Sequence, residues 1–341
     1  MQRDALIAIG GGLLSAVAAV SFFGGSVFSI LFVYFASVPL LLVGLGLGPR
    51  AVTVAVGAGI VATALTGNML HAGIFALVQA FPAWVITRLS ILQIAGSGPA
   101  STPVVGPDTA SSAMPAAAPP TAGGFVAWLS PGLTLSVLAL CSGLFILFAA
   151  LSVGDDGLKG AVDAYLGTAF ELMMPAMEDQ VKAQLVSKMS AFFPGAIAAS
   201  WVIMVITNAA VAQGILVRAG KNLLPTPVYA AIDLPLWMSW PLVIAAATAL
   251  AANMIGADEL GYAAYNVTMV FAVPYFFLGL AVIHTLARRV TATGMVLVGV
   301  YGVIMVSLWT AVVVVAVGIA EQWIGLRDRQ QDEDDGQSPD E

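Results

Sequence analysis

The chain has 341 residues, of which 60% are hydrophobic and only 9% are charged. An average soluble domain is about one quarter charged, so this composition excludes a soluble protein. Apolar runs of roughly 20 residues recur along the chain, which is the length that a helix needs to cross about 30 Å of hydrocarbon. The runs are continuous rather than alternating, which excludes an outer-membrane barrel. We therefore predict an all-α fold, a polytopic bundle of transmembrane helices in contact with the lipid bilayer.

The formal net charge of −7 comes from the C-terminal tail. Seven of the nineteen acidic residues follow Arg327, in a segment with no apolar side chains to bury. The net charge therefore describes a tail that we predict to be disordered over residues 327–341, and not a binding surface. Cys141 is the only cysteine, which excludes an intramolecular disulfide and a cysteine metal cluster.

The N-terminal part, residues 1–94, contains four predicted spans. They lie near residues 5–23, 27–48, 51–67 and 69–88. The third is short and weakly hydrophobic. Arg3 before the first run is also typical of a cleaved signal peptide, but the glycines within that run and the many later spans favour a retained helix. Residues 95–124 then hold six prolines with Ser, Ala and Gly, which predicts a flexible linker.

The C-terminal part, residues 125–326, contains five more predicted spans. They lie near residues 127–153, 194–217, 236–256, 262–287 and 292–322. Between the first two, residues 155–193 carry apolar residues at helical spacing with charges on the other faces, which predicts a pair of amphipathic helices. The prediction is about nine spans. It becomes eight if the short third run does not cross or the long last run is misread.

The orientation follows from the basic residues of short loops. With the N-terminus in the cytoplasm, seven basic residues lie on the cytoplasmic side: Arg3, Arg50, Arg88, Arg218, Lys221, Arg288 and Arg289. This threading places the amphipathic insertion outside the cytoplasm. The acidic tail lies outside with nine spans and inside with eight.

Several polar side chains lie within the predicted spans, where hydrocarbon offers them no hydrogen-bond partner. In the N-terminal part these are Asn68, His71 and Gln79. The candidates for binding a small polar solute lie in the C-terminal bundle: Asn208, Gln213, Asn253, Asn266 and Pro274. Pro274 removes one backbone hydrogen bond and leaves a carbonyl free. The alternative is that the amides only join helices, which membrane bundles commonly do.

Small residues recur every four positions on the first predicted helix, at Ala8, Gly12 and Ala16. Such a face lets two helices approach closely. It either packs within the chain or docks a separate membrane partner protein.

Other features argue against an enzyme or a carrier that uses intramembrane carboxylates. No predicted span has an acidic residue near its centre. The sequence has no phosphate-binding glycine loop, no zinc-binding histidine pair and no nucleophile motif. We expect no catalytic residues, no metal, no cofactor and no nucleic-acid partner.

The region from Asn208 to Gly214 and the run from Pro274 to Gly279 resemble the YybS-like family of bacterial membrane proteins, a domain of unknown function (2232). The resemblance covers most of the chain without the linker and tail, and it implies a location in the bacterial inner membrane. That family is distantly similar to the S components of energy-coupling factor transporters and to the rod-shape protein MreD. It therefore implies a transporter or the substrate-binding part of one, or alternatively an envelope scaffold or assembly factor that acts through protein partners.

Overall fold

The computed structural model describes residues 2–21, 27–96, 131–154, 156–223 and 232–327. All secondary structure in these ranges is helical, which confirms the predicted fold class. The chain divides into two compact units: residues 1–130 with 208–226, and residues 131–207 with 227–341. We call them unit 1 and unit 2. The predicted linker beyond residue 96 and the tail beyond Arg327 lie outside the described residues.

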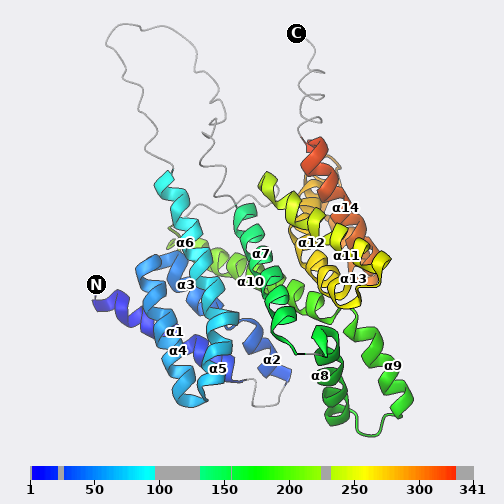
Figure 1. The fold of residues 1–341 in the computed structure, drawn as a ribbon. Coiled ribbons are helices and arrows are strands. Elements are labelled where there is room, and N and C mark those ends of the chain that lie inside the picture. Colours follow the sequence, from blue (N-terminus) through cyan, green and yellow to red (C-terminus); the bar gives the residue numbers. More distant parts are fainter. Residues whose placement is uncertain (1, 22–26, 97–130, 155, 224–231, 328–341) are drawn as a thin grey trace, which may run out of the picture. The chain divides into compact units, whose positions relative to one another are not determined.

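Unit 1 contains the N-terminal helices and the second half of α10 (Figure 1). Its elements are α1 (Gln2–Val20), α2 (Val27–Tyr34), α3 (Val38–Leu47), α4 (Pro49–Thr66), α5 (Met69–Phe75), the π-helical turn η2 (Ala76–Ala80), α6 (Phe81–Gly96) and the end of α10 (Phe193–Arg218). Helix α1 packs against α4 and α3, and α3 packs against α4 and α6.

Helices α1 and α4 cross at a close backbone contact in unit 1. Gly12 and Gly59 face each other there, and a Cβ atom on Gly12 would collide with the backbone of Ala55. In a bilayer the hydrophobic effect does not drive helices together, so close backbone packing at small residues has to hold them. Ala8 and Ala16 are buried on the same face of α1.

Unit 2 is built around the long helix α12 (Asp258–Ala287), which packs against α7, α11 and α14. Its other elements are α7 (Pro131–Ser152), α8 (Gly157–Met173), α9 (Asp179–Ser190), the first half of α10, the 3-10 turn η5 (Leu236–Met238), α11 (Ser239–Ile255), α13 (Thr293–Val306) and α14 (Leu308–Ile324). Because α12 touches most of the other helices, it carries the largest set of buried residues.

Unit 2 has two ends that its contacts define. At one end, Gly132 at the start of α7 contacts Asp233 just before η5 and α11; we call this the Asp233 end. At the other end, Glu259 at the start of α12 contacts Gly157 at the start of α8, and we call this the Glu259 end. The tight turn at Gly256 joins α11 to α12 at the Glu259 end, so α12 finishes toward the Asp233 end.

The predicted amphipathic pair is present as α8 and α9, which pack against each other. The pair lies at the Glu259 end, where the Tyr262 hydroxyl of α12 donates to the carbonyl of Ser190 at 2.7 Å. Leu158 and Leu166 are buried on α8, whereas Tyr165 and Met173 of the predicted apolar row are exposed.

Eight helical segments of the described chain are long and apolar enough to cross a bilayer. This matches the lower of the two predicted counts. Many of their apolar side chains are exposed, as expected for helices that are surrounded by lipid. The predicted ninth span differs from the structure, because residues 293–324 form two shorter helices separated by Ser307 in an extended conformation.

Candidate functional site

The helix of the second predicted span is interrupted within unit 1. Helix α2 ends at Tyr34, α3 begins at Val38, and residues 35–37 form a turn between them. Pro39 explains the break, because it has no N–H to donate to the carbonyl of Phe35. That carbonyl instead accepts a shorter-range bond from the N–H of Val38 at 3.0 Å.

Three side chains from other helices bond to the carbonyl groups of this break. Asn208 of α10 donates through Nδ2 to the carbonyl of Tyr34 at 2.8 Å, and Gln79 of η2 donates through Nε2 to that of Val33 at 3.1 Å. Ser15 of α1 donates to the carbonyl of Ala36 at 2.5 Å. Together with the turn's own bonds, these donors leave no carbonyl from Val33 to Ser37 without a partner, as membrane depth demands.

The two amides at the break have unused acceptors. Asn208 also donates to Ser37 Oγ at 2.8 Å, so its NH₂ group faces the break and its Oδ1 faces away. Asn208 Oδ1 and Gln79 Oε1 are buried and accept no hydrogen bond from the described residues. A buried acceptor left unpaired costs about 1–3 kcal/mol, so each of these oxygens calls for an explanation.

The break and its amides lie near the middle of their candidate membrane spans. Residues 35–37, Gln79 and Asn208 each stand close to the midpoint of their candidate spans, Ser29–Leu47, Met69–Ser90 and Phe193–Arg218. Interrupted helices at this depth are how many transporters form solute sites, because freed polar groups there face a cavity or a ligand.

Gln79 reaches the break from a π-helical turn, Ala76–Ala80. Such a turn holds one residue more than an α turn and is frequent at functional sites. The same turn borders an apolar hollow of about 290 Å³ in unit 1, lined by Thr53, Ala76, Phe81 and Trp84 among others. Its lining is apolar apart from Thr53, so this hollow does not gather polar groups.

The structure divides the five predicted binding residues between the units. Asn208 and Gln213 belong to unit 1, and Asn253, Asn266 and Pro274 belong to unit 2. Gln213 is buried on α10 beyond Asn208, and Asn253 is exposed on α11. Of the five, only Asn208 takes part in the helix break.

Asn266 joins helices within unit 2. Its Oδ1 accepts from the N–H of Gly195 at 2.8 Å, and its Nδ2 donates to the carbonyls of Tyr262 at 2.9 Å and Ala191 at 3.3 Å. This pairing holds the turn between α9 and α10 to α12. Both ends of the amide are used, so Asn266 has the joining role that the sequence analysis gave as the alternative.

Pro274 does not end its helix. Helix α12 continues through it from Asp258 to Ala287, and Pro274 is buried. The adjacent Tyr275 is also buried, and its hydroxyl donates to Ser239 Oγ on α11 at 3.4 Å.

The small residues proposed to dock a partner lie inside unit 1. Ala8, Gly12 and Ala16 are buried, and Gly12 meets the backbone of α4. A partner would have to displace α4 to reach this face, so the contact is packing within the chain.

Sequence reasoning overlooked most of the break. The sequence pattern does not indicate Ser15 or Ser37, and it marks Gln79 only as a polar residue within a span. The available signal was Pro39 inside an apolar run, next to Ser37. Among the described residues, no three His, Cys, Asp or Glu side chains are grouped to hold a metal ion.

Comparison with known proteins identifies the larger, C-terminal portion of the chain. Neither a curated protein nor a solved structure matches the sequence. A family model described as "Predicted membrane protein (DUF2232)" matches residues 123–321, which is more than half of the chain and includes Asn208 but not the residues of the break. The chain therefore belongs to the DUF2232 family of predicted membrane proteins.

Proposed function

We propose that this protein binds a small polar solute at the helix break of unit 1, either as a transporter or as the substrate-binding component of one. The observation that supports this proposal is the pair of buried, unused amide oxygens on Gln79 and Asn208 beside an interrupted helix at mid-membrane depth. The resemblance to S components of energy-coupling factor transporters that the sequence analysis noted would agree with this role.

The chemistry of the break favours an uncharged solute with at least two hydrogen-bond donors. Both free groups are acceptors, so they complement N–H or O–H groups. The sequence has no acidic residue from Ala5 to Gly96 or from Phe193 to Arg218, so nothing there would neutralise a cation in hydrocarbon. Residues Ser15, Gln79 and Asn208 would define the site, with the carbonyls of residues 33–37 as its frame.

Thermal-shift measurements on the purified full-length chain in lipid nanodiscs test the proposal. A panel of small uncharged solutes with two or more donors should contain one that raises the unfolding midpoint, because a ligand of the folded state stabilises it. Gln79→Met keeps the size of the side chain and removes its acceptor, so it should weaken binding at least tenfold. Gln213→Met, on α10 beyond Asn208, makes the same change at an amide with no described bond to the break and is the matched control.

Two outcomes would contradict the proposal. One is the absence of any stabilising solute in the panel. The other is an equal loss of binding in Gln79→Met and Gln213→Met. If a solute binds, counterflow in proteoliposomes then distinguishes a complete transporter, which moves the solute, from a binding component, which does not.

The second candidate is an envelope scaffold that acts through protein partners, and the surface of α8 favours it. Tyr165, Leu172 and Met173 are exposed on a helix outside the eight candidate spans. Crosslinking in native membranes should then capture one stoichiometric partner, and Leu172→Ser should release it. A partner that is captured equally by the variant would argue against this candidate.

A further inference from the structure

The segment that reads as a ninth span is a pair of short helices, of which the first is too short to cross the membrane. Helix α13 has 14 residues and α14 has 17. At about 1.5 Å per residue, α13 reaches about 21 Å, which is less than the roughly 30 Å of hydrocarbon. None of its residues is buried, and Ser307 separates it from α14 in an extended conformation.

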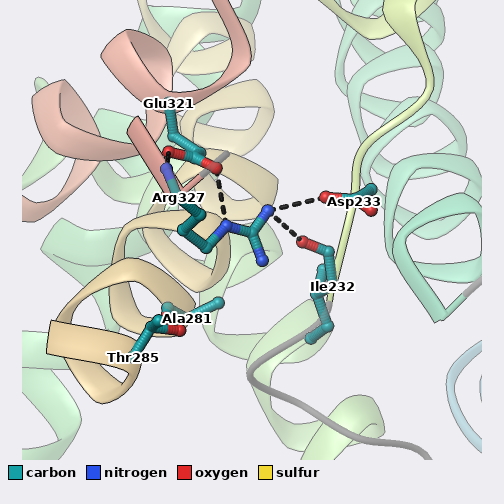
Figure 2. A network of polar contacts seen from close by, with 6 residues as sticks. All are labelled: Ile232, Asp233, Ala281, Thr285, Glu321 and Arg327. Atoms are coloured by element: carbon teal, nitrogen blue, oxygen red, sulfur yellow. Dashed lines mark hydrogen bonds and ion pairs between the residues drawn. The ribbon is translucent and has the colours of Figure 1, made fainter. Parts of the chain in front are cut away.

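The pair starts and finishes at the same end of unit 2. Helix α12 finishes toward the Asp233 end at Ala287, and α13 begins shortly after it at Thr293. Beyond α14, the Arg327 guanidinium binds Asp233 Oδ1 at 2.6 Å and the carbonyl of Ile232 at 3.1 Å (Figure 2). The chain therefore arrives at, and returns to, the Asp233 end.

Contacts along α14 agree with this path. Gln322 Nε2 donates to the carbonyl of Pro235 at 3.3 Å, one residue before η5. Earlier in α14, Gly318 packs against the backbone of Tyr275, and Val314 packs through its backbone against Gly279. Helices α14 and α12 therefore cross without a side chain between them at these glycines. Figure 1 shows α14 finishing at the same end of unit 2 at which α7 begins.

A cluster of charged side chains holds the C-terminal end of α14 in place. Arg327 Nε donates to Glu321 Oε1 at 2.6 Å, and the Glu321 side chain is only 6% exposed. Asp233, by contrast, is 79% exposed, so the cluster extends from the buried side of α14 to the surface of the Asp233 end. Arg327 is thereby the residue that ties the finish of the hairpin to the start of α11.

We propose that α13 and α14 form a re-entrant hairpin that enters and leaves the membrane at the Asp233 end, anchored there by Glu321, Arg327 and Asp233. The chain then crosses the bilayer eight times, and its acidic C-terminus emerges on the same side as the loop that precedes Asp233. Nothing in this inference depends on the solute site of unit 1.

Cysteine labelling of the full-length chain tests this topology. In a Cys141→Ala background, a cysteine added directly after Glu341 is compared with two reference positions at opposite ends. Lys221→Cys, in the loop before Asp233, reports the Asp233 side; Glu178→Cys, between α8 and α9, reports the Glu259 side. Each variant is treated with a membrane-impermeant maleimide in intact cells and in inverted vesicles.

If the hairpin is re-entrant, the C-terminal cysteine should react with the maleimide in the preparation in which Lys221→Cys reacts. It should not react in the preparation in which Glu178→Cys reacts. Labelling together with Glu178→Cys would overturn the proposal, because the segment would then cross the membrane. Asp258→Cys provides a second reference for the Glu259 side if Glu178→Cys disturbs the helix pair. A variant that fails to reach the membrane is identified by its absence from the membrane fraction.

Discussion

Gln79 and Asn208 donate hydrogen bonds to the carbonyl groups of consecutive residues, Val33 and Tyr34. The two amides come from helices far apart in the sequence, yet they meet at one interrupted turn. Each donates its N–H to the break and keeps a buried oxygen unused. The two amides thus satisfy the carbonyl groups of the break and leave two acceptors for an additional hydrogen-bond donor.

Asn208→Ala should destabilise the protein. It leaves the Tyr34 carbonyl without its donor at membrane depth, which costs about 1–3 kcal/mol for the orphaned group. The unfolding midpoint in detergent should fall measurably. Thr207→Ala, an exposed neighbour on α10 whose hydroxyl bonds only within the helix, is the control and should be nearly neutral. Equal midpoints for the two variants would contradict the described role of Asn208.

Gly12→Ala should destabilise unit 1, because the added Cβ would collide with the backbone of Ala55. Overpacking of this kind typically costs about 1–3 kcal/mol. Gly10→Ala is the matched variant, since nothing lies within 4 Å of that position, and it should be neutral or slightly stabilising through helix propensity. If Gly12→Ala keeps the wild-type midpoint but loses a co-purifying protein, the face serves a partner and not α4.

Gly318→Ala should loosen the crossing of α12 and α14. A Cβ there would meet the carbonyl of Tyr275, so a loss of about 1–3 kcal/mol is expected. Gly302→Ala on α13 has open space and provides the comparison. The readout is the midpoint difference between the two variants. No difference would mean that α14 is not packed as described.

Arg327→Ala should be among the more damaging single changes at the C-terminal end. It leaves Glu321 buried without its cation, and removing one partner of a buried pair typically costs about 3–5 kcal/mol. Adding Glu321→Gln should restore much of the loss, because the remaining buried charge is gone. Asp179→Ala, which removes the fully exposed partner of Lys182, should change the unfolding midpoint little. Failure of the double variant to recover would argue against an ionic role.

Asp163 should make the amphipathic pair acid-sensitive. Burial would raise the pKa of its carboxyl, but the hydrogen bond and the positive charge of Lys159, together with the nearby Ser190 hydroxyl, lower it below the ordinary value. Because the pKa is lower in the folded state, the ionised carboxyl stabilises the fold at pH values above the ordinary aspartate pKa of about 3.9. This stabilisation is lost as the pH falls from there through the lower folded-state pKa. The midpoint difference between wild type and Asp163→Asn should thus be present at neutral pH and close in acid. If the midpoint difference between the two proteins grew in acid, the sign of the predicted pKa shift would be wrong.

Hydrophobicity and periodicity were sufficient to predict the helical class, eight of the nine predicted spans and the amphipathic pair, because these features follow from local composition. Helix α8 ends at Met173, just before Pro175, and α9 begins at Asp179, both within the predicted insertion. The placement of Asn208 near mid-span was also predictable, but its partners at Tyr34 and Ser37 were not. Those contacts depend on tertiary packing, which the local pattern does not encode.

The two breaks illustrate the difference. Pro39 marks the first break in the sequence, since proline removes a backbone donor. The second, at Ser307, has no proline or glycine beside it, and the run Val306 to Trp309 is strongly apolar. Arg327 was misleading for a similar reason: it begins a charged segment that looks like solvent-exposed tail, whereas Glu321 and Asp233 hold it from distant positions.

The π-helical turn at Ala76–Ala80 amounts to one inserted residue in a helix. If one residue of that turn were deleted, the helix from Met69 onward would become regular and every later side chain would rotate by about 100°. Trp84 and Thr87 would leave their present faces, and Gln79 could no longer sit opposite Val33. The register of unit 1 is thus set by the length of this five-residue segment, and the length should tolerate less variation here than the identity of its apolar members.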